Sequence, residues 1–117
     1  MNKSEALDKI QYSLKSEEVQ VITPQRETYE EYVEKLSRML IDSVIDPVKA
    51  TITSACAKEG AFELYKNSEV WAIARKNDNW LLTLEGKQEF ALGFGDDLNN
   101  IMMHGFSSAD ALGEWCV

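Results

Sequence analysis

The spacing of apolar residues changes once along this chain, near residue 61, and this change limits the folds open to it. Before residue 61, apolar side chains recur every three or four residues, which gathers them on one face of a helix. After it, apolar and polar residues alternate in short runs, as they do in strands. Helices followed by consecutive strands predict an α+β fold, and 117 residues fit a single domain over residues 1–117.

The first two predicted helices have recognisable start signals. Ser4 is a candidate N-cap for the first helix. A longer helix begins either at Thr23, which precedes a proline, or at Thr28, which has Glu31 three residues on as in a capping box. Residues 17–23 form either a short edge strand or an extended linker. The apolar faces are formed by Leu7, Ile10 and Leu14 in the first helix and by Tyr29, Tyr32, Val33, Leu36, Met39, Leu40 and Val44 in the second.

Two further helical segments are predicted from capping signals. In residues 46–60, an Asp-Pro pair provides a cap and a first-turn proline, and a glycine stands at the end. In residues 96–105, Asp96 or Asp97 begins a short turn of helix that Gly105 ends. The carboxylate and amide oxygens of this second segment also leave open a weak divalent-cation site, although it lacks the ligand spacing of an EF-hand.

The second half of the chain predicts an antiparallel meander. Polar residues 75–79 and the glycine at 86 mark its tight turns. We expect the N-terminal helices to pack on one face of this sheet and the other face to be half exposed, because Leu81 and Thr83 form a less apolar side. A short C-terminal helix is expected after Ser107. The four predicted strands are residues 61–65, 69–74, 80–85 and 89–94.

The charge of the chain excludes some partners and favours others. Its net charge is −8, and the acidic residues are concentrated in segments 17–34 and 88–117. Such a chain repels phosphate backbones, so we expect no nucleic-acid binding. No apolar run reaches the ~18–20 residues of a membrane span, and the N-terminus lacks the apolar core of a signal peptide. We therefore expect a cytoplasmic protein that does not bind membranes.

The residues available for catalysis are few. His104 is the only imidazole, and its place beside a glycine is more typical of a helix end than of a catalytic base. No serine stands in a nucleophile-elbow motif, and Cys56 and Cys116 are expected to be small buried hydrophobes that bind no metal. We assign no catalytic residue and expect no cofactor or metal. Whether the protein is an enzyme stays open, with a non-enzymatic role favoured.

The aromatic residues allow two interpretations. Trp71 and Trp80 flank one predicted turn, where they either belong to the core between sheet and helices or line a ligand pocket. In the second case Tyr29 and Tyr32 contribute hydroxyl groups and His104 contributes its imidazole. The alternative function is therefore small-molecule binding, or a minor enzymatic activity, in a pocket between the sheet and the helices.

Two segments resemble a group of known proteins. They are "NSEVWAIARKNDNWLLT", with a tryptophan in each of two strands, and "SSADALGEW", an alanine-containing terminal helix. In this order, over roughly residues 62–116, they are similar to small acidic α+β proteins of unknown function from bacterial mobile gene cassettes and immunity-gene neighbourhoods. The aromatic–proline step of that pattern before the last helix is absent here. The resemblance implies no catalytic residues.

The favoured hypothesis is a non-enzymatic binding protein with an acidic surface. Four glutamates, Glu27, Glu30, Glu31 and Glu34, lie on or beside the long predicted helix. A surface of this sign attracts a basic protein partner, as that of an immunity protein or antitoxin does. A third hypothesis is a homodimer formed through the exposed side of the meander.

Overall fold

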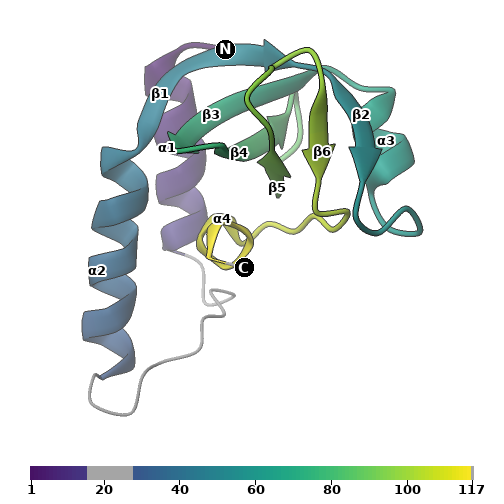
Figure 1. The fold of residues 1–117 in the computed structure, drawn as a ribbon. Helices are drawn as coiled ribbons and strands as arrows, with labels where there is room; N and C mark the ends of the chain where they lie inside the picture. The colour runs from purple at the N-terminus through teal and green to yellow at the C-terminus, as the bar shows by residue number, and fades with distance from the viewer. Residues whose placement is uncertain (16–27, 117) are drawn as a thin grey trace.

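The computed structural model describes residues 1–15 and 28–116, and the order of its elements confirms an α+β fold (Figure 1). In these residues six strands form one mixed sheet, so the prediction of four antiparallel strands is wrong. The predicted segment 17–23 and the Thr23 start lie outside the described residues. The elements are α1 (Lys3–Leu14), α2 (Tyr29–Asp42), β1 (Val44–Ala50), β2 (Ile52–Ala55), α3 (Phe62–Lys66), β3 (Val70–Lys76), β4 (Asn79–Leu84), β5 (Phe90–Phe94), β6 (Ile101–Met103) and α4 (Ala111–Trp115).

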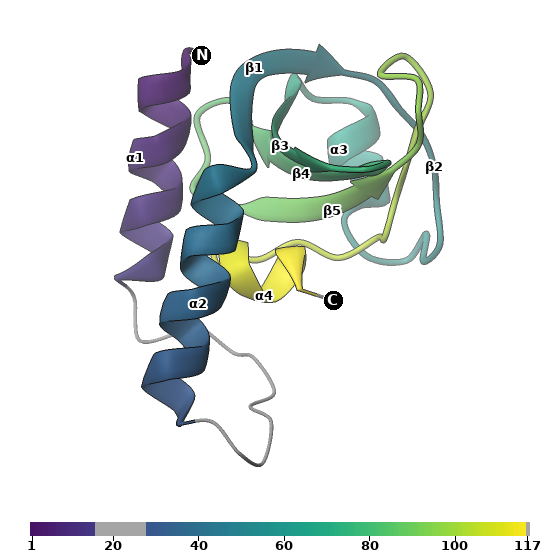
Figure 2. The ribbon, with the colours of Figure 1, turned by 60° about the vertical axis from the view of Figure 1, so that its left-hand side comes forward.

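The two edges of the sheet are joined by a single residue. The strand order is β1-β3-β4-β5-β6-β2, and only Thr51 separates β1 from β2 in the chain. The Thr51 N–H donates to the carbonyl of Leu98 (2.8 Å), and the Thr51 carbonyl accepts from the N–H of Ile101 (2.9 Å). β2 pairs with β6 in parallel, whereas the other neighbours are antiparallel. The sheet therefore rolls up, with β1 arching over it toward β2 (Figure 2).

The predicted helix over residues 46–60 is wrong, because this segment contains β1 and β2. Pro47 lies in an edge strand, where the register with β3 shifts between Val44 and Val48. A proline is tolerated at such a place because its missing N–H breaks no regular ladder. β-Branched residues favour strands, and this run is rich in them: Val44, Ile45, Val48, Thr51, Ile52 and Thr53.

The predicted strand over residues 61–65 is also wrong, because Phe62–Lys66 forms the short helix α3. Its inward residues are Phe62 and Tyr65, three positions apart, which is the spacing of one helical turn. Leu64, which a strand would place beside Phe62, is 38% exposed. The apparent alternation of apolar residues is too short here to identify a strand.

The loop over residues 96–105 contains a strand rather than the predicted turn of helix. Asp97 does form a turn, since its side chain accepts from the N–H of Asn99. The chain then continues as β6, in which Ile101 and Met103 are buried and Met102 between them is exposed. This period of two is typical of a strand, and β6 is completed by its neighbours β2 and β5.

The other predicted elements are confirmed, with adjusted starts. The capping box of α1 is formed by Asn2 and Glu5 rather than by Ser4. The side chain of Thr28 caps α2, which was one of its two predicted starts. The side chain of Asp110, not Ser107, caps α4. The strands β3, β4 and β5 lie where the alternation predicts them, within one or two residues.

Both faces of the rolled sheet are buried, which corrects the prediction of a half-exposed face. Leu81 and Thr83 are inaccessible to solvent. The outer face packs under α1, α2 and α4, and the inner face packs on itself and on α3. No helix in the described ranges is long and apolar enough to cross a membrane. The outer core includes Ile10, Leu40, Ile73, Leu81, Phe90 and Leu112, and the inner core includes Ile52, Trp80, Leu82, Leu84, Ile101 and Met103.

Replacing Gly105 by alanine should destabilise the fold more than replacing Gly86. Both glycines have positive φ, 119° and 78°, so each change incurs backbone strain of about 1–3 kcal/mol. A Cβ on Gly105 would also meet the carbonyl oxygen of Ala57 at 2.1 Å, whereas a Cβ on Gly86 has nothing within 4 Å. We expect Gly105→Ala to lower the free energy of unfolding by roughly 2 kcal/mol more than Gly86→Ala in urea titrations. Equal losses would contradict the close packing of the segments that follow β2 and β6.

Candidate functional site

The predicted acidic surface lies on α2, a helix that extends well beyond the sheet (Figure 1). Glu30, Glu31 and Glu34 are exposed, and Glu27 lies outside the described residues. Only Leu40, near the C-terminal end, is buried in this helix of 14 residues. Most of the apolar stripe of α2 is therefore only partly covered by the described residues.

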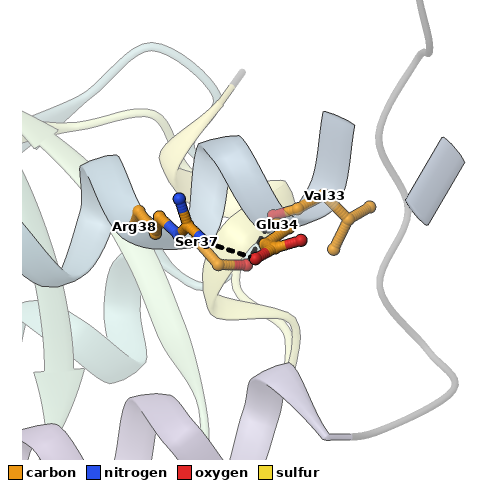
Figure 3. A network of polar contacts seen from close by, with 4 residues as sticks. All are labelled: Val33, Glu34, Ser37 and Arg38. Atoms are coloured by element: carbon orange, nitrogen blue, oxygen red, sulfur yellow. Dashed lines mark hydrogen bonds and ion pairs between the residues drawn. The ribbon is translucent and has the colours of Figure 1, made fainter. Parts of the chain in front are cut away.

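One of these glutamates, Glu34, forms an ion pair within the helix. Glu34 accepts from the guanidinium of Arg38 at 2.5 Å, one turn away, while Ser37 donates to the carbonyl of Val33 (Figure 3). The two charged side chains are 64% and 75% exposed. Exposed pairs of this spacing contribute only about 0.3–0.5 kcal/mol. Glu34 can therefore exchange Arg38 for another cation at small cost.

A groove of about 360 Å³ runs beside this helix. Side chains from α2, from the β3–β4 turn and from α4 line it. The groove combines apolar and aromatic surface with one cationic group and two amides. Its lining residues are Tyr32, Leu36, Met39, Lys76, Asn77, Asn79, Trp115 and Cys116.

The five residues predicted to form an aromatic pocket are not brought together. Trp71 packs against the outer core, and its indole N–H donates to Glu85 at 2.5 Å. Trp80 is 3% exposed on the inner face and donates to the carbonyl of Gly95. The two tryptophans thus lie on opposite faces of the sheet. Of the five, all within the described ranges, Tyr32 alone lines the groove, and Tyr29 is an exposed residue at the start of α2.

His104 lies away from the groove, directly after β6, among a second group of polar side chains. Three polar atoms of this group are almost wholly buried, namely Nδ1 of His104, Oη of Tyr65 and Oε1 of Glu89, and the Tyr65 hydroxyl lies within hydrogen-bond reach of Glu89 and Ser107. Backbone hydrogen bonds hold the three segments together. The N–H of Ala61, next to α3, donates to the carbonyl of Gly105 (2.7 Å), and Phe90 exchanges hydrogen bonds with Ser108.

Burial and charge act on the same group of side chains. Burial raises the pKa of Tyr65, and the neighbouring Glu89 carboxylate raises it further, whereas Ser107 lowers it. Burial also raises the pKa of Glu114, while a hydrogen bond with Ser108 and the charge of His104 oppose that shift. Glu114 also contributes to the rise in the pKa of Tyr65. We refer to Tyr65, Glu89, His104 and Glu114 as the Tyr65 cluster.

Of this cluster, sequence reasoning singled out His104 as a candidate site residue, but not Tyr65 or Glu114. Tyr65 was assigned to a strand, and the signal that could have identified it is its helical spacing from Phe62. The cysteines were also misplaced, because Cys56 and Cys116 are exposed rather than buried. Within residues 1–15 and 28–116, no group of three His, Cys, Asp or Glu side chains is arranged to hold a metal ion.

Replacing Glu114 by glutamine should stabilise the protein at neutral pH relative to acid pH. Because burial raises its pKa above the ordinary 4.5, the folded state binds this proton more tightly than the unfolded state. The stability that Glu114 contributes is therefore full at low pH and is lost as pH rises through the folded pKa. The free energy of unfolding of Glu114→Gln, relative to the native chain, should rise between about pH 4 and pH 7. A difference that stays constant with pH would contradict the burial of Glu114.

Comparison with known proteins gives no family for this chain. No family model matches the sequence, and no curated protein or solved structure matches it. The resemblance to small acidic bacterial proteins therefore stays an expectation.

Proposed function

We propose that this protein is a non-enzymatic binding protein that presents α2 to a basic protein partner. The observation that carries the proposal is the exposure of Glu30, Glu31 and Glu34 on a helix of which only Leu40 is buried. Val33 and Leu36 are only partly buried against the outer core, and burial of an apolar face supplies most of a helix's stability in proteins. A partner that covers the remaining apolar stripe of α2 would stabilise it.

Charge complementarity specifies the kind of partner. The chain has 20 acidic and 12 basic residues. A second shallow hollow along α2 is lined by three acidic side chains together with two basic ones and a methionine: Glu31, Glu34, Asp42, Lys35, Arg38 and Met39. Complementary charge mainly speeds encounter and selects among partners. Lysine or arginine side chains on the partner would pair with Glu30 and Glu31, and would compete with Arg38 for Glu34.

The groove beside α2 supplies the apolar part of such an interface. Protein interfaces combine a desolvated apolar centre with a polar rim, and aromatic and methionine side chains are enriched in the centre. Tyr32, Met39 and Trp115 line the groove, and the glutamates of α2 lie on the neighbouring exposed surface. This arrangement fits an immunity-like or antitoxin-like role. A homodimer would need a surface other than the sheet faces, because both are covered within one chain.

Neutralising the glutamates of α2 should slow association with the partner. The partner is first obtained by affinity capture on the purified chain at low salt and is then purified itself. The triple variant Glu30→Gln, Glu31→Gln, Glu34→Gln should associate roughly tenfold more slowly, because steering by charge is lost. For the native chain, the association rate should fall by a similar factor between about 50 mM and 300 mM NaCl. Surface plasmon resonance measures both effects.

A second triple variant separates local from overall charge. Asp8→Asn, Glu59→Gln and Asp96→Asn remove the same number of negative charges at exposed positions outside α2. This variant should associate at nearly the native rate. If the two triples slow association equally, or if the rate of the native chain does not depend on salt, α2 is not the binding surface.

A further inference from the structure

We propose that the groove beside α2 binds a small organic carboxylate with an apolar body. The groove has a volume of about 360 Å³, which lies within the roughly 300–1,000 Å³ typical of small-molecule sites. This ligand site is independent of the partner proposed for α2, because the residues that line the groove define it. Such a ligand would compete with that partner for the groove but not for the exposed glutamates.

The apolar wall of the groove is built by α2 and α4, which lie side by side (Figure 2). Tyr32, Leu36 and Met39 follow one another at helical spacing, so they share one face of α2. Leu36 and Trp115 are half-buried because they also pack against the outer core. This wall is therefore formed before any ligand binds, as in most small-molecule sites.

The polar groups of the groove come from the turn between β3 and β4. Lys76 and Asn79 are paired directly across the two strands, which places their side chains on the same side of this ribbon. Asn77 follows in the turn with φ 57°, a left-handed conformation that asparagine tolerates better than most residues. One ammonium and two amides, all able to donate N–H, thus lie beside the apolar wall.

These three donor groups are available to a ligand. Lys76, Asn77 and Asn79 are exposed, and within residues 1–15 and 28–116 no side chain or carbonyl forms a hydrogen bond or ion pair with their side-chain nitrogens. The backbone carbonyl of Asn77 accepts from Arg75, which leaves its side-chain amide unengaged. A carboxylate that entered the groove would therefore displace water rather than a protein partner.

Charge in the groove favours an anion. Of the described residues that line it, none is acidic and Lys76 alone is cationic. The neighbouring aspartates have partners of their own, since Asp78 pairs with Arg75 (3.9 Å) and Asp110 caps α4. One positive charge with two neutral donors matches the single negative charge of a carboxylate, whereas a phosphate group carries nearly twice that charge.

Two exposed cysteines provide a probe of the groove and an internal control. Cys116 lines the groove, whereas Cys56 follows β2 and donates its N–H to the carbonyl of Met103. Phenylacetate should slow the alkylation of Cys116 by N-ethylmaleimide saturably and leave that of Cys56 unchanged, as mass spectrometry of the peptides measures. We expect half-protection at about 1–20 mM, the affinity range of so small a ligand.

Three related compounds, used at the same ionic strength, separate the parts of the ligand. Acetate lacks the apolar ring, and phenethylammonium reverses the charge, so neither should give saturable protection of Cys116. Phenylacetamide keeps the ring but lacks the charge, so it should protect roughly fivefold more weakly than phenylacetate, because charge-assisted hydrogen bonds are the stronger ones.

Substitutions in the turn test the donors. Lys76→Met keeps the length of the side chain but removes its charge, so phenylacetate should bind roughly fivefold more weakly, whereas Lys76→Arg should bind within about twofold of the native chain. Asn79→Asp places a carboxylate in the groove without changing its shape and should weaken binding roughly tenfold. Lys3→Met and Asn99→Asp make the same changes at exposed positions outside the groove and should bind like the native chain.

The variants are compared by the concentration of phenylacetate that gives half-protection. Absolute alkylation rates differ for another reason, because burial and Asp110 raise the pKa of Cys116 while Lys76 lowers it. Circular dichroism checks that each variant folds, as the exposure of all four positions predicts. No measurement uses the partner proposed for α2, so either proposal can fail alone.

Four results would overturn the proposal. The first is no protection of Cys116 by phenylacetate, or equal protection of Cys56. The second is equal protection of Cys116 by acetate or phenylacetamide, which would show that ring and charge do not act together. The third is native affinity in both Lys76→Met and Asn79→Asp. The fourth is tighter binding of phenyl phosphate than of phenylacetate, which would identify a phosphate site instead.

Discussion

The fold depends on one geometric constraint: a single residue, Thr51, joins the two edges of the sheet. Two strands separated by one residue in the chain must lie close together in space. Because β1 and β2 form opposite edges of the sheet, they can lie close together only if the sheet rolls up. The rolling places β2 beside β6 in parallel and brings the segments that follow them together. The hydrogen bond from Ala61 to Gly105 is formed there, and it brings α3 beside the end of β6. The Tyr65 cluster exists only because the sheet is rolled.

Rolling also explains why the strands are apolar on both sides. In β4, Trp80, Leu82 and Leu84 point to the inner core, while Leu81 packs under the helices. A flat meander with one solvated face would alternate more strictly between apolar and polar residues. The unbroken burial of Trp80 to Leu84 is the signature of a strand covered twice. The same pattern leaves the exposed edges of the molecule, including α2, as the places where a partner can bind.

Sequence patterns predicted the elements that are determined by interactions between residues close together in the chain. The strands β3, β4 and β5 were predictable because each pairs with its neighbour in the chain through a short turn, and the Thr28 cap fixes α2 through its own residues. Residues 44–55 were not predictable as two strands, because their partners lie about 20–50 residues further on and Asp46-Pro47 also suits a helix start. In the candidate site, the exposure of the glutamates of α2 could be predicted from helical spacing. The residues that surround His104 could not be predicted, because the pairing of β2 with β6 brings them together.

The two candidate regions differ in what holds them in their present form. On α2, the visible interactions are exposed, and a pair such as Glu34–Arg38 is worth a few tenths of a kcal/mol. In the Tyr65 cluster, by contrast, Tyr65 is 1% exposed and its hydroxyl lies within hydrogen-bond reach of Glu89 and Ser107, so burial and polar contacts together hold it. The rolled sheet, apolar on both faces, supplies the packing.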